Sequence, residues 1–165
     1  MRILVFTEGT IVDDRERDGE WRMIGDAARK LQAWARNGAT IVYMSSKRKK
    51  ETLEEVRRTL RDGGAPSGEL FFRKGSEHYG QTAERARPDV IVEDDCKSIG
   101  GAAQMTYPKL KNELRRRVKQ VVVPEFEGID LLPDDPTELG FSHDRTRVIR
   151  ALPSSSGDHK HTGSF

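Results

Sequence analysis

Acidic, hydroxyl and basic side chains follow four short apolar runs of this chain, at the points where strands would end. They lie at residues 7–10 (TEGT), 45–46 (SS), 73–75 (RKG) and 93–95 (EDD). Carboxylates favour a hard cation such as Mg²⁺, whereas Lys and Ser side chains suit phosphate oxygens. This combination predicts phosphoryl chemistry, in which positioning and charge neutralisation carry most of the catalysis.

The apolar segments that would position these groups alternate between two periods. Short β-branched runs at 3–6, 40–44, 70–72, 90–92 and 120–123 predict strands that are buried on both faces. Amphipathic stretches lie between them, so the expected order is β-α-β-α-β-α-β-α-β. The sequence therefore predicts an α/β Rossmannoid fold with a central, mostly parallel five-stranded sheet flanked by helices. Ligands bind at the carboxyl ends of the strands in such sheets.

Four helices are expected from apolar residues at spacings of three and four. The first pattern begins at Trp21 and runs to residue 34, and the second covers residues 53–60. Two shorter helices are predicted around residues 83–86 and 110–114. Glycine pairs or Asn-Gly after the first two patterns are typical helix stops.

The remaining segments are polar. Residues 10–20 are longer than a usual βα loop and predict a small flap over the strand ends. A last strand is expected at residues 147–151, so one domain would span residues 1–152. Residues 153–165 predict a disordered tail, in which His159 and His161 are expected to bind nothing specific.

Composition excludes several classes of protein. The chain has 165 residues, a formal net charge of +2, 34% charged residues and 35% hydrophobic residues, which indicates one domain with a modest core. No apolar run exceeds four residues, so we expect neither a membrane span nor a signal peptide. The single cysteine, Cys96, builds no disulfide frame and is expected to be structural. A cytoplasmic location is the expectation.

Each of the chemical segments also has a simpler interpretation. Residues 7–10 are typical of a turn and helix start, and Ser45 and Ser46 are typical N-cap residues for the helix that follows. The run at residues 47–50 (KRKK) is typical of a solvated face. Three adjacent carboxylates after a buried strand are harder to explain in this way, because like charges repel and need a cation or basic partners. They favour a functional site.

Taken in order, these residues resemble the four motifs of the haloacid dehalogenase-like (HAD) phosphohydrolase superfamily over roughly residues 2–135. The run ILVFTEGT at residues 3–10 is similar to the first motif, and Ser45 matches the second. Lys74 matches the third motif, and Asp94 with Asp95 matches the fourth. The chain also resembles an uncharacterised prokaryotic group of HAD-like proteins that share a Phe-Thr-Glu-Gly-Thr first motif.

The resemblance fails at the family's nucleophile. The first motif's attacking Asp corresponds to Phe6, whose ring can neither attack phosphorus nor bind metal. The resemblance implies no large cap domain and assigns roles to the residues that remain. Glu8 and Asp95 are the candidate catalytic residues, Thr10, Ser45, Ser46 and Lys74 the candidate phosphate ligands, and Asp94, Glu8 and Glu93 the candidate Mg²⁺ ligands.

Three functions of different classes remain open. The first is a module that binds a phosphorylated small molecule with Mg²⁺ but lacks the aspartyl-phosphate route. The second is a phosphohydrolase in which Glu8 acts as general base on a metal-bound water.

The third is an interaction module for nucleic acid or protein, based on the basic residues at 115–117, Lys119 and residues 47–50. Glutamates interleave with the last group and no aromatic stacking motif accompanies either, which disfavours nucleic acid. An uncapped rim would admit a macromolecule or be closed by a second subunit, so a homo-oligomer is also an open prediction.

Overall fold

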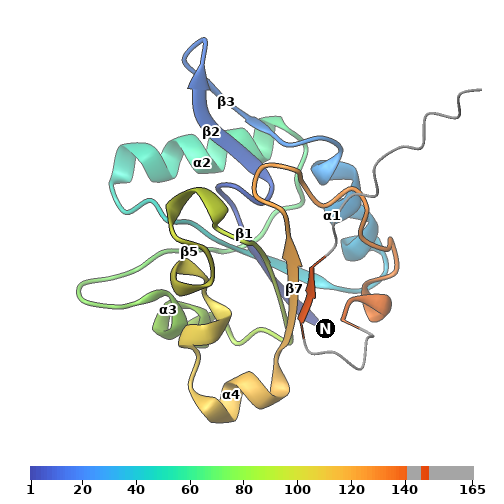
Figure 1. Cartoon of the computed structure of the whole chain (residues 1–165). Coiled ribbons are helices and arrows are strands. Elements are labelled where there is room, and N and C mark those ends of the chain that lie inside the picture. The colour runs from blue at the N-terminus through green and yellow to red at the C-terminus, as the bar shows by residue number, and fades with distance from the viewer. Residues whose placement is uncertain (141–145, 149–165) are drawn as a thin grey trace, which may run out of the picture.

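A computed structural model describes residues 1–140 and 146–148, which contain a six-stranded sheet covered by helices (Figure 1). All pairs of neighbouring strands in this sheet are parallel, and their order is β5-β4-β1-β6-β7-β8. The strands are β1 (Arg2–Phe6), β4 (Thr40–Met44), β5 (Leu70–Phe71), β6 (Val90–Asp94), β7 (Lys119–Val123) and β8 (Thr146–Val148).

The five predicted strands are confirmed, and the sheet has one strand more than the predicted five. Strand β8 pairs with β7 and overlaps the start of the strand predicted at residues 147–151. Residues 149–151 and the predicted tail at 153–165, with both of its histidines, lie outside the described residues.

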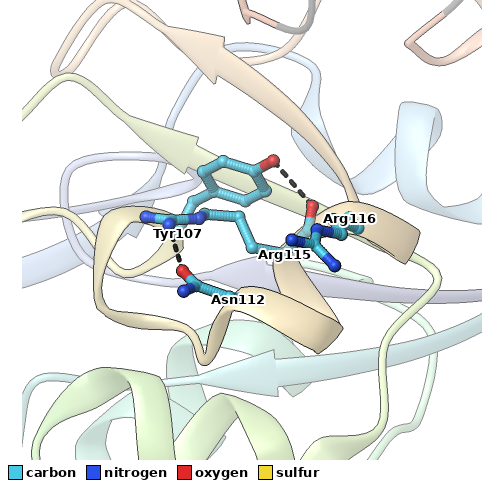
Figure 2. Close-up of a pocket in the computed structure, with 4 residues that line it drawn as sticks. All are labelled: Tyr107, Asn112, Arg115 and Arg116. Atoms are coloured by element: carbon cyan, nitrogen blue, oxygen red, sulfur yellow. Dashed lines mark hydrogen bonds between the residues drawn. The ribbon is translucent and has the colours of Figure 1, made fainter.

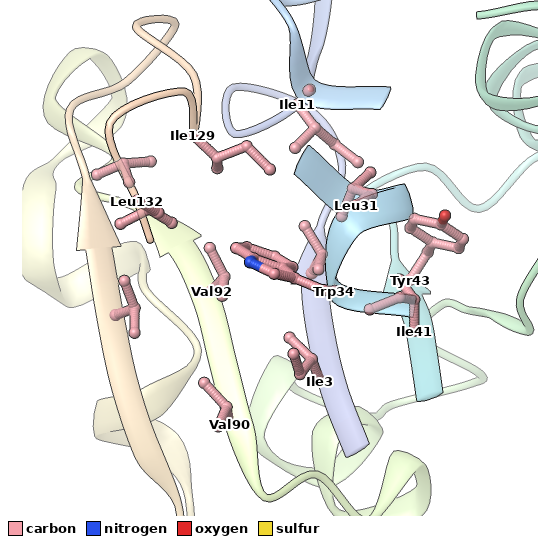
Figure 3. Packing of buried hydrophobic residues seen from close by; sticks show 14 of the residues in the cluster. Ile3, Ile11, Leu31, Trp34, Ile41, Tyr43, Val90, Val92, Ile129 and Leu132 are labelled. Atoms are coloured by element: carbon pink, nitrogen blue, oxygen red, sulfur yellow. The ribbon is translucent and has the colours of Figure 1, made fainter. Parts of the chain in front are cut away.

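Alternate residues of each strand pack into two cores on opposite faces of the sheet, as expected for a period of two. One core contains Ile3, Tyr43 and Val92 from three strands, packed around the fully buried Trp34 (Figure 3). The other contains Leu4 and its neighbours Val42 and Ile91. Helices therefore cover both faces, which explains why the strand segments contain apolar residues at consecutive positions.

Four α-helices provide these covers: α1 (Ala27–Arg36), α2 (Lys50–Asp62), α3 (Tyr79–Ala86) and α4 (Asn112–Arg117). Helices α1 and α2 pack on the Trp34 face, whereas α3 packs on the opposite face. Short 3₁₀ turns are η1 (Lys97–Ile99), η2 (Gly101–Gln104), η3 (Tyr107–Lys109) and η4 (Pro136–Glu138).

The first predicted helix is wrong at its start. Trp21 lies in an antiparallel hairpin formed by β2 (Val12–Arg17) and β3 (Glu20–Met23), and the helix begins only at Ala27. Gly25 separates the two elements with φ +52°, a left-handed conformation that does not continue a helix. The hairpin occupies the segment for which a small flap was predicted, and it packs beside α2 (Figure 1).

The chain beyond β7 forms turns and the short η4, and it completes the core on the α1 side. Ile129, Leu132 and Leu139 are almost fully buried there, and the indole Nε1 of Trp34 donates to the carbonyl of Pro133 at 2.9 Å. These apolar residues lie in and around turns, so no helix or strand period reveals them.

The connections create a switch point between β1 and β6. From β1 the chain moves through α1 to β4 and through α2 to β5, and then crosses by α3 to β6 on the other side of β1. Chain segments diverge to opposite faces after β1 and β6, which leaves the ends of these strands as the expected ligand position in an open α/β sheet.

Candidate functional site at the carboxyl edge of the sheet

The segment after β1 forms a tight turn at the switch point. The carbonyl of Thr7 accepts hydrogen bonds from the N–H groups of Thr10, Ile11 and Val12, at 3.2, 2.9 and 2.9 Å. The predicted turn at residues 7–10 is therefore confirmed, but a hairpin and not a helix follows it. This turn holds the side chains of Glu8 and Thr10 in buried positions.

The Glu8 carboxylate lies in a cradle of donors from the end of β4. Its Oε1 accepts from the Ser45 hydroxyl at 2.7 Å, the Ser46 N–H at 2.7 Å and the Ser46 hydroxyl at 2.6 Å. Its Oε2 contacts the Ser45 hydroxyl at 3.0 Å and the hydroxyl of Thr7. Only 7% of Glu8 is exposed, so these donors are engaged by a buried carboxylate of the protein itself.

The N-cap interpretation of Ser45 and Ser46 is wrong. Lys49 is the N-cap residue of α2, and no side-chain hydrogen bond caps that helix. We refer to Ser45, Ser46 and Thr7 as the anion cradle, because their donors converge on the carboxylate of Glu8.

Asp94 and Thr10 form a second buried pair across the switch point. The Thr10 hydroxyl donates to Asp94 Oδ1 at 2.8 Å and accepts from the Asp94 N–H at 3.0 Å, while Asp94 Oδ2 accepts from the Cys96 N–H at 3.0 Å. Burial raises the pKa of Asp94, and these hydrogen bonds partly offset that effect. Gly9 approaches this carboxylate so closely that a Cβ would lie 3.0 Å from Asp94 Oδ1.

Glu93 belongs to the opposite face of β6 and supports the fold there. Its carboxylate accepts from the N–H groups of Thr106 and Tyr107, at 2.7 and 3.0 Å, and from the Gln120 side chain at 3.0 Å. Burial raises its pKa. Asp95 has a similar local role, since its Oδ1 accepts from the N–H groups of Lys97 and Glu125. Within the described residues, no hydrogen bond joins either side chain to the side chain of Glu8 or Asp94.

Phe6 packs against an aromatic side chain of α3. Its ring meets Tyr79 edge-to-face, with 5.5 Å between ring centres and an interplanar angle of 77°. The Arg73 guanidinium lies 4.4 Å from the centre of the same Tyr79 ring, and its buried Nε has no hydrogen-bond partner among the described residues. Burial raises the pKa of Tyr79. The positive charge of Arg73 lowers this pKa, whereas the negative charge of Glu8 raises it.

Arg73, and not the predicted phosphate ligand Lys74, contacts the Tyr79 ring. The Lys74 side chain is exposed, its backbone N–H donates to Glu77, and its ammonium lies 5.9 Å from the centre of the Phe72 ring. Sequence reasoning missed Arg73, although the two-residue period from Phe71 places it toward the α3 face.

The basic run at residues 47–50 divides into two parts. Lys47 forms an ion pair with Asp14 at 2.7 Å and lies 5.2 Å from the ring centre of Trp21, which ties the hairpin to the end of β4. Arg48 donates to the carbonyl of Gly75 at 2.6 Å. Arg48, Lys49 and Lys50 are exposed, which confirms the solvated-face interpretation for these three residues.

Cys96 lies beside Asp94 in a left-handed conformation with φ +51°. Burial raises the pKa of its thiol, and the negative charges of Asp94 and Glu93 raise it further. Because the thiolate is the nucleophilic form, this environment disfavours a reactive cysteine.

The candidate Mg²⁺ ligands do not gather into a metal site as they are arranged. Within residues 1–140 and 146–148, no three His, Cys, Asp or Glu side chains gather in a way that would hold a metal ion. The carboxylates of Glu8, Asp94 and Glu93 are each engaged by hydroxyl or N–H donors instead. Magnesium binding stays a prediction.

Comparison with protein-family models, with curated proteins and with solved structures found no match to this chain. Among the helices that the structure describes, none has the length and apolar character needed to cross a membrane. The parallel α/β fold is established by the strand order itself.

Proposed function

We propose that this chain is a HAD-like protein that binds a phosphorylated small molecule at the carboxyl edge without an aspartyl-phosphate step. The observation that carries the proposal is the anion cradle: hydroxyl groups and one backbone N–H converge on the Glu8 carboxylate. A phosphate group presents anionic oxygens to the same kinds of donor. The cradle lies at the carboxyl ends of β1 and β4, beside the switch point, and open α/β sheets bind ligands at the carboxyl ends of their strands.

One cation supports this assignment. The Arg73 guanidinium lies 4.4 Å from the centre of the Tyr79 ring, which packs against Phe6 at the end of β1. The buried Nε of Arg73 lacks a partner in the described part of the chain and is available to an anionic oxygen. Guanidinium groups bind phosphate oxygens through paired, charge-assisted hydrogen bonds.

Phe6 argues against covalent catalysis at this edge. Its phenyl ring packs against Tyr79 and carries no atom able to attack phosphorus. The general-base alternative is also weakened, because the oxygens of Glu8 already accept hydrogen bonds from Ser45 and Ser46. A base needs a lone pair directed at the proton that it removes.

A bound phosphate would compete with Glu8 for the cradle. Replacing Glu8 with glutamine removes the negative charge while keeping the shape of the side chain. We therefore expect inorganic phosphate, or a phosphorylated sugar or nucleotide, to bind Glu8→Gln about tenfold more tightly than the wild type, and to bind Ser46→Ala more weakly.

Calorimetry and thermal shift on wild type, Glu8→Gln, Ser46→Ala and the control Glu138→Gln test this, each with and without Mg²⁺. Glu138 is exposed on η4, so its variant repeats the charge change away from the cradle. A ligand at 100 times its Kd adds about 2.7 kcal/mol to the free energy of unfolding. Absence of binding to both wild type and Glu8→Gln would overturn the proposal, as would an equal gain in Glu138→Gln.

A further inference from the structure

A second concave surface lies around η3 and α4, away from the anion cradle. It encloses about 470 Å³ and is lined by Tyr107, Asn112, Arg115 and Arg116, which we call the α4 pocket (Figure 2). Helix α4 leads into the first residue of β7, so the pocket belongs to the amino edge of the sheet, opposite the carboxyl edge. The function proposed above makes no use of it.

The positive charge of the chain is concentrated in this region. Residues 109–119 contain six Lys or Arg residues and one acidic residue, Glu113, for a formal charge of +5. The whole chain carries only +2, so all other residues together sum to −3. The net basic character of the protein is therefore a property of the α4 region, which focuses a positive field on one surface.

Contacts within the pocket hold some of its polar groups in place. The Tyr107 hydroxyl donates to the carbonyl of Arg115 at 2.9 Å, and the Arg115 guanidinium donates to Asn112 Oδ1 (Figure 2). A longer contact of 3.4 Å joins Arg115 Nη1 to the carbonyl of Pro108. Arg115 is thus oriented before any ligand arrives, which lowers the entropic cost of binding.

Arg116 differs from Arg115 in having nothing to bind within the described residues. It is exposed, and no hydrogen bond or ion pair joins its guanidinium to residues 1–140 or 146–148. Cations in the last turn of a helix also interact favourably with the helix dipole. That effect explains their position on α4, but it explains neither the concave surface nor the aromatic ring beside them.

We propose that the α4 pocket binds the phosphodiester backbone of single-stranded nucleic acid. Its guanidinium groups are spread over an open surface instead of converging on one point, which suits a chain of phosphates better than a single phosphate. The Tyr107 ring supplies the aromatic surface that basic sequence runs alone lack, and bases stack on such rings without sequence preference. The structure brings it to Arg115 from a separate element, η3.

Fluorescence anisotropy of labelled 12-nucleotide oligo-U and oligo-dT, titrated with the full chain, tests this proposal. We expect Arg116→Glu to weaken binding at least tenfold, and Arg116→Gln to lower the slope of log K against log salt by about 0.7, the contribution of one single-strand phosphate contact. Arg36→Glu is the matched control, because Arg36 is likewise exposed at the end of a helix but lies on α1. It should change binding less than twofold.

Several outcomes would overturn the proposal. They are no binding of either oligonucleotide at 50 mM salt, equal losses in Arg116→Glu and Arg36→Glu, or equally tight binding of an acidic peptide such as oligo-glutamate. A mononucleotide that binds more tightly than the oligomer and loses this affinity in Arg116→Glu would instead indicate a small-ligand site in the α4 pocket and would also contradict the proposal. Inorganic phosphate binding that depends on Ser46 reports on the anion cradle alone, so failure here is distinct from failure there.

Discussion

The carboxyl edge and the α4 pocket use charged side chains in opposite ways. At the carboxyl edge Glu8 is buried and accepts hydrogen bonds from the chain itself, whereas Arg116 in the α4 pocket is exposed and has no such contact within the described residues. A buried charge must be paired inside the molecule, because leaving it unpaired costs several kcal/mol. An exposed, unpaired charge costs the fold little and stays available to an outside partner. The contrast predicts that mutations at the carboxyl edge reduce the stability of the fold, whereas mutations in the α4 pocket reduce ligand binding.

The largest expected effect comes from Glu8→Ala. This change leaves the Ser46 N–H and the hydroxyls of the cradle without their acceptor in a buried position, so we expect the free energy of unfolding to fall by about 3 kcal/mol. Urea denaturation followed by circular dichroism measures it. Glu8→Gln should lose less, because its amide oxygen still accepts. Equal stability of Glu8→Ala and wild type would mean that the cradle contributes nothing to the fold.

Gly9→Ala is expected to come next, at about 2 kcal/mol. Gly9 has φ +81°, a conformation that costs roughly 1 kcal/mol for alanine, and the added Cβ would also press on the Asp94 carboxylate. Gly19→Ala is the matched control: its φ is +74°, but nothing lies within 4 Å of the added Cβ. The difference between the two variants in urea denaturation isolates the contact with Asp94, and no difference would exclude it.

A smaller effect is expected from lowering the pH until Glu77, a residue outside the anion cradle, is protonated. Hydrogen bonds from Arg85 and the Lys74 N–H lower the pKa of Glu77 to about 2. Because the folded pKa lies below the unfolded value of about 4.5, the stabilisation is complete above that value and is lost as pH falls toward 2. Glu77→Gln should therefore show a flatter decline in stability between pH 4.5 and 2. Parallel curves would contradict this.

The smallest change in stability is expected from Arg116→Ala. We expect the free energy of unfolding to change by less than about 0.5 kcal/mol, as for other surface substitutions without partners. The same denaturation assay measures it. A loss as large as that of Glu8→Ala would show that α4 needs this cation, and the contrast between the two regions would fail.

The short strands could be predicted from sequence because each is apolar at consecutive positions. That pattern requires burial on both faces, and only a covered parallel sheet provides it. The start of α1 was not predictable, because Trp21 and Ile24 have the spacing of a helix although Trp21 lies in a hairpin that packs on α2. The competing signal was Gly25, whose left-handed conformation stops the helix pattern.

The site was predictable as a set of strand ends but not as a set of contacts. Strand order brings Glu8 near Ser45, yet the bond between them depends on side-chain rotamers that no spacing reveals. Whether Arg73 or Lys74 contacts Tyr79 depends on the face of the sheet toward which each side chain points after β5. Tyr107 reaches Arg115 through a 3₁₀ turn with no sequence period.

The two tryptophans provide built-in optical probes of different parts of this molecule. Trp34 is sealed in the core, whereas Trp21 lies on the hairpin with the Lys47 ammonium 5.2 Å from its ring. Acrylamide should therefore quench emission from Trp21 and spare Trp34 until the protein unfolds. An anion that draws Lys47 toward the cradle would alter only the quenchable part of the emission, so ligand capture and global unfolding have separate fluorescence signals.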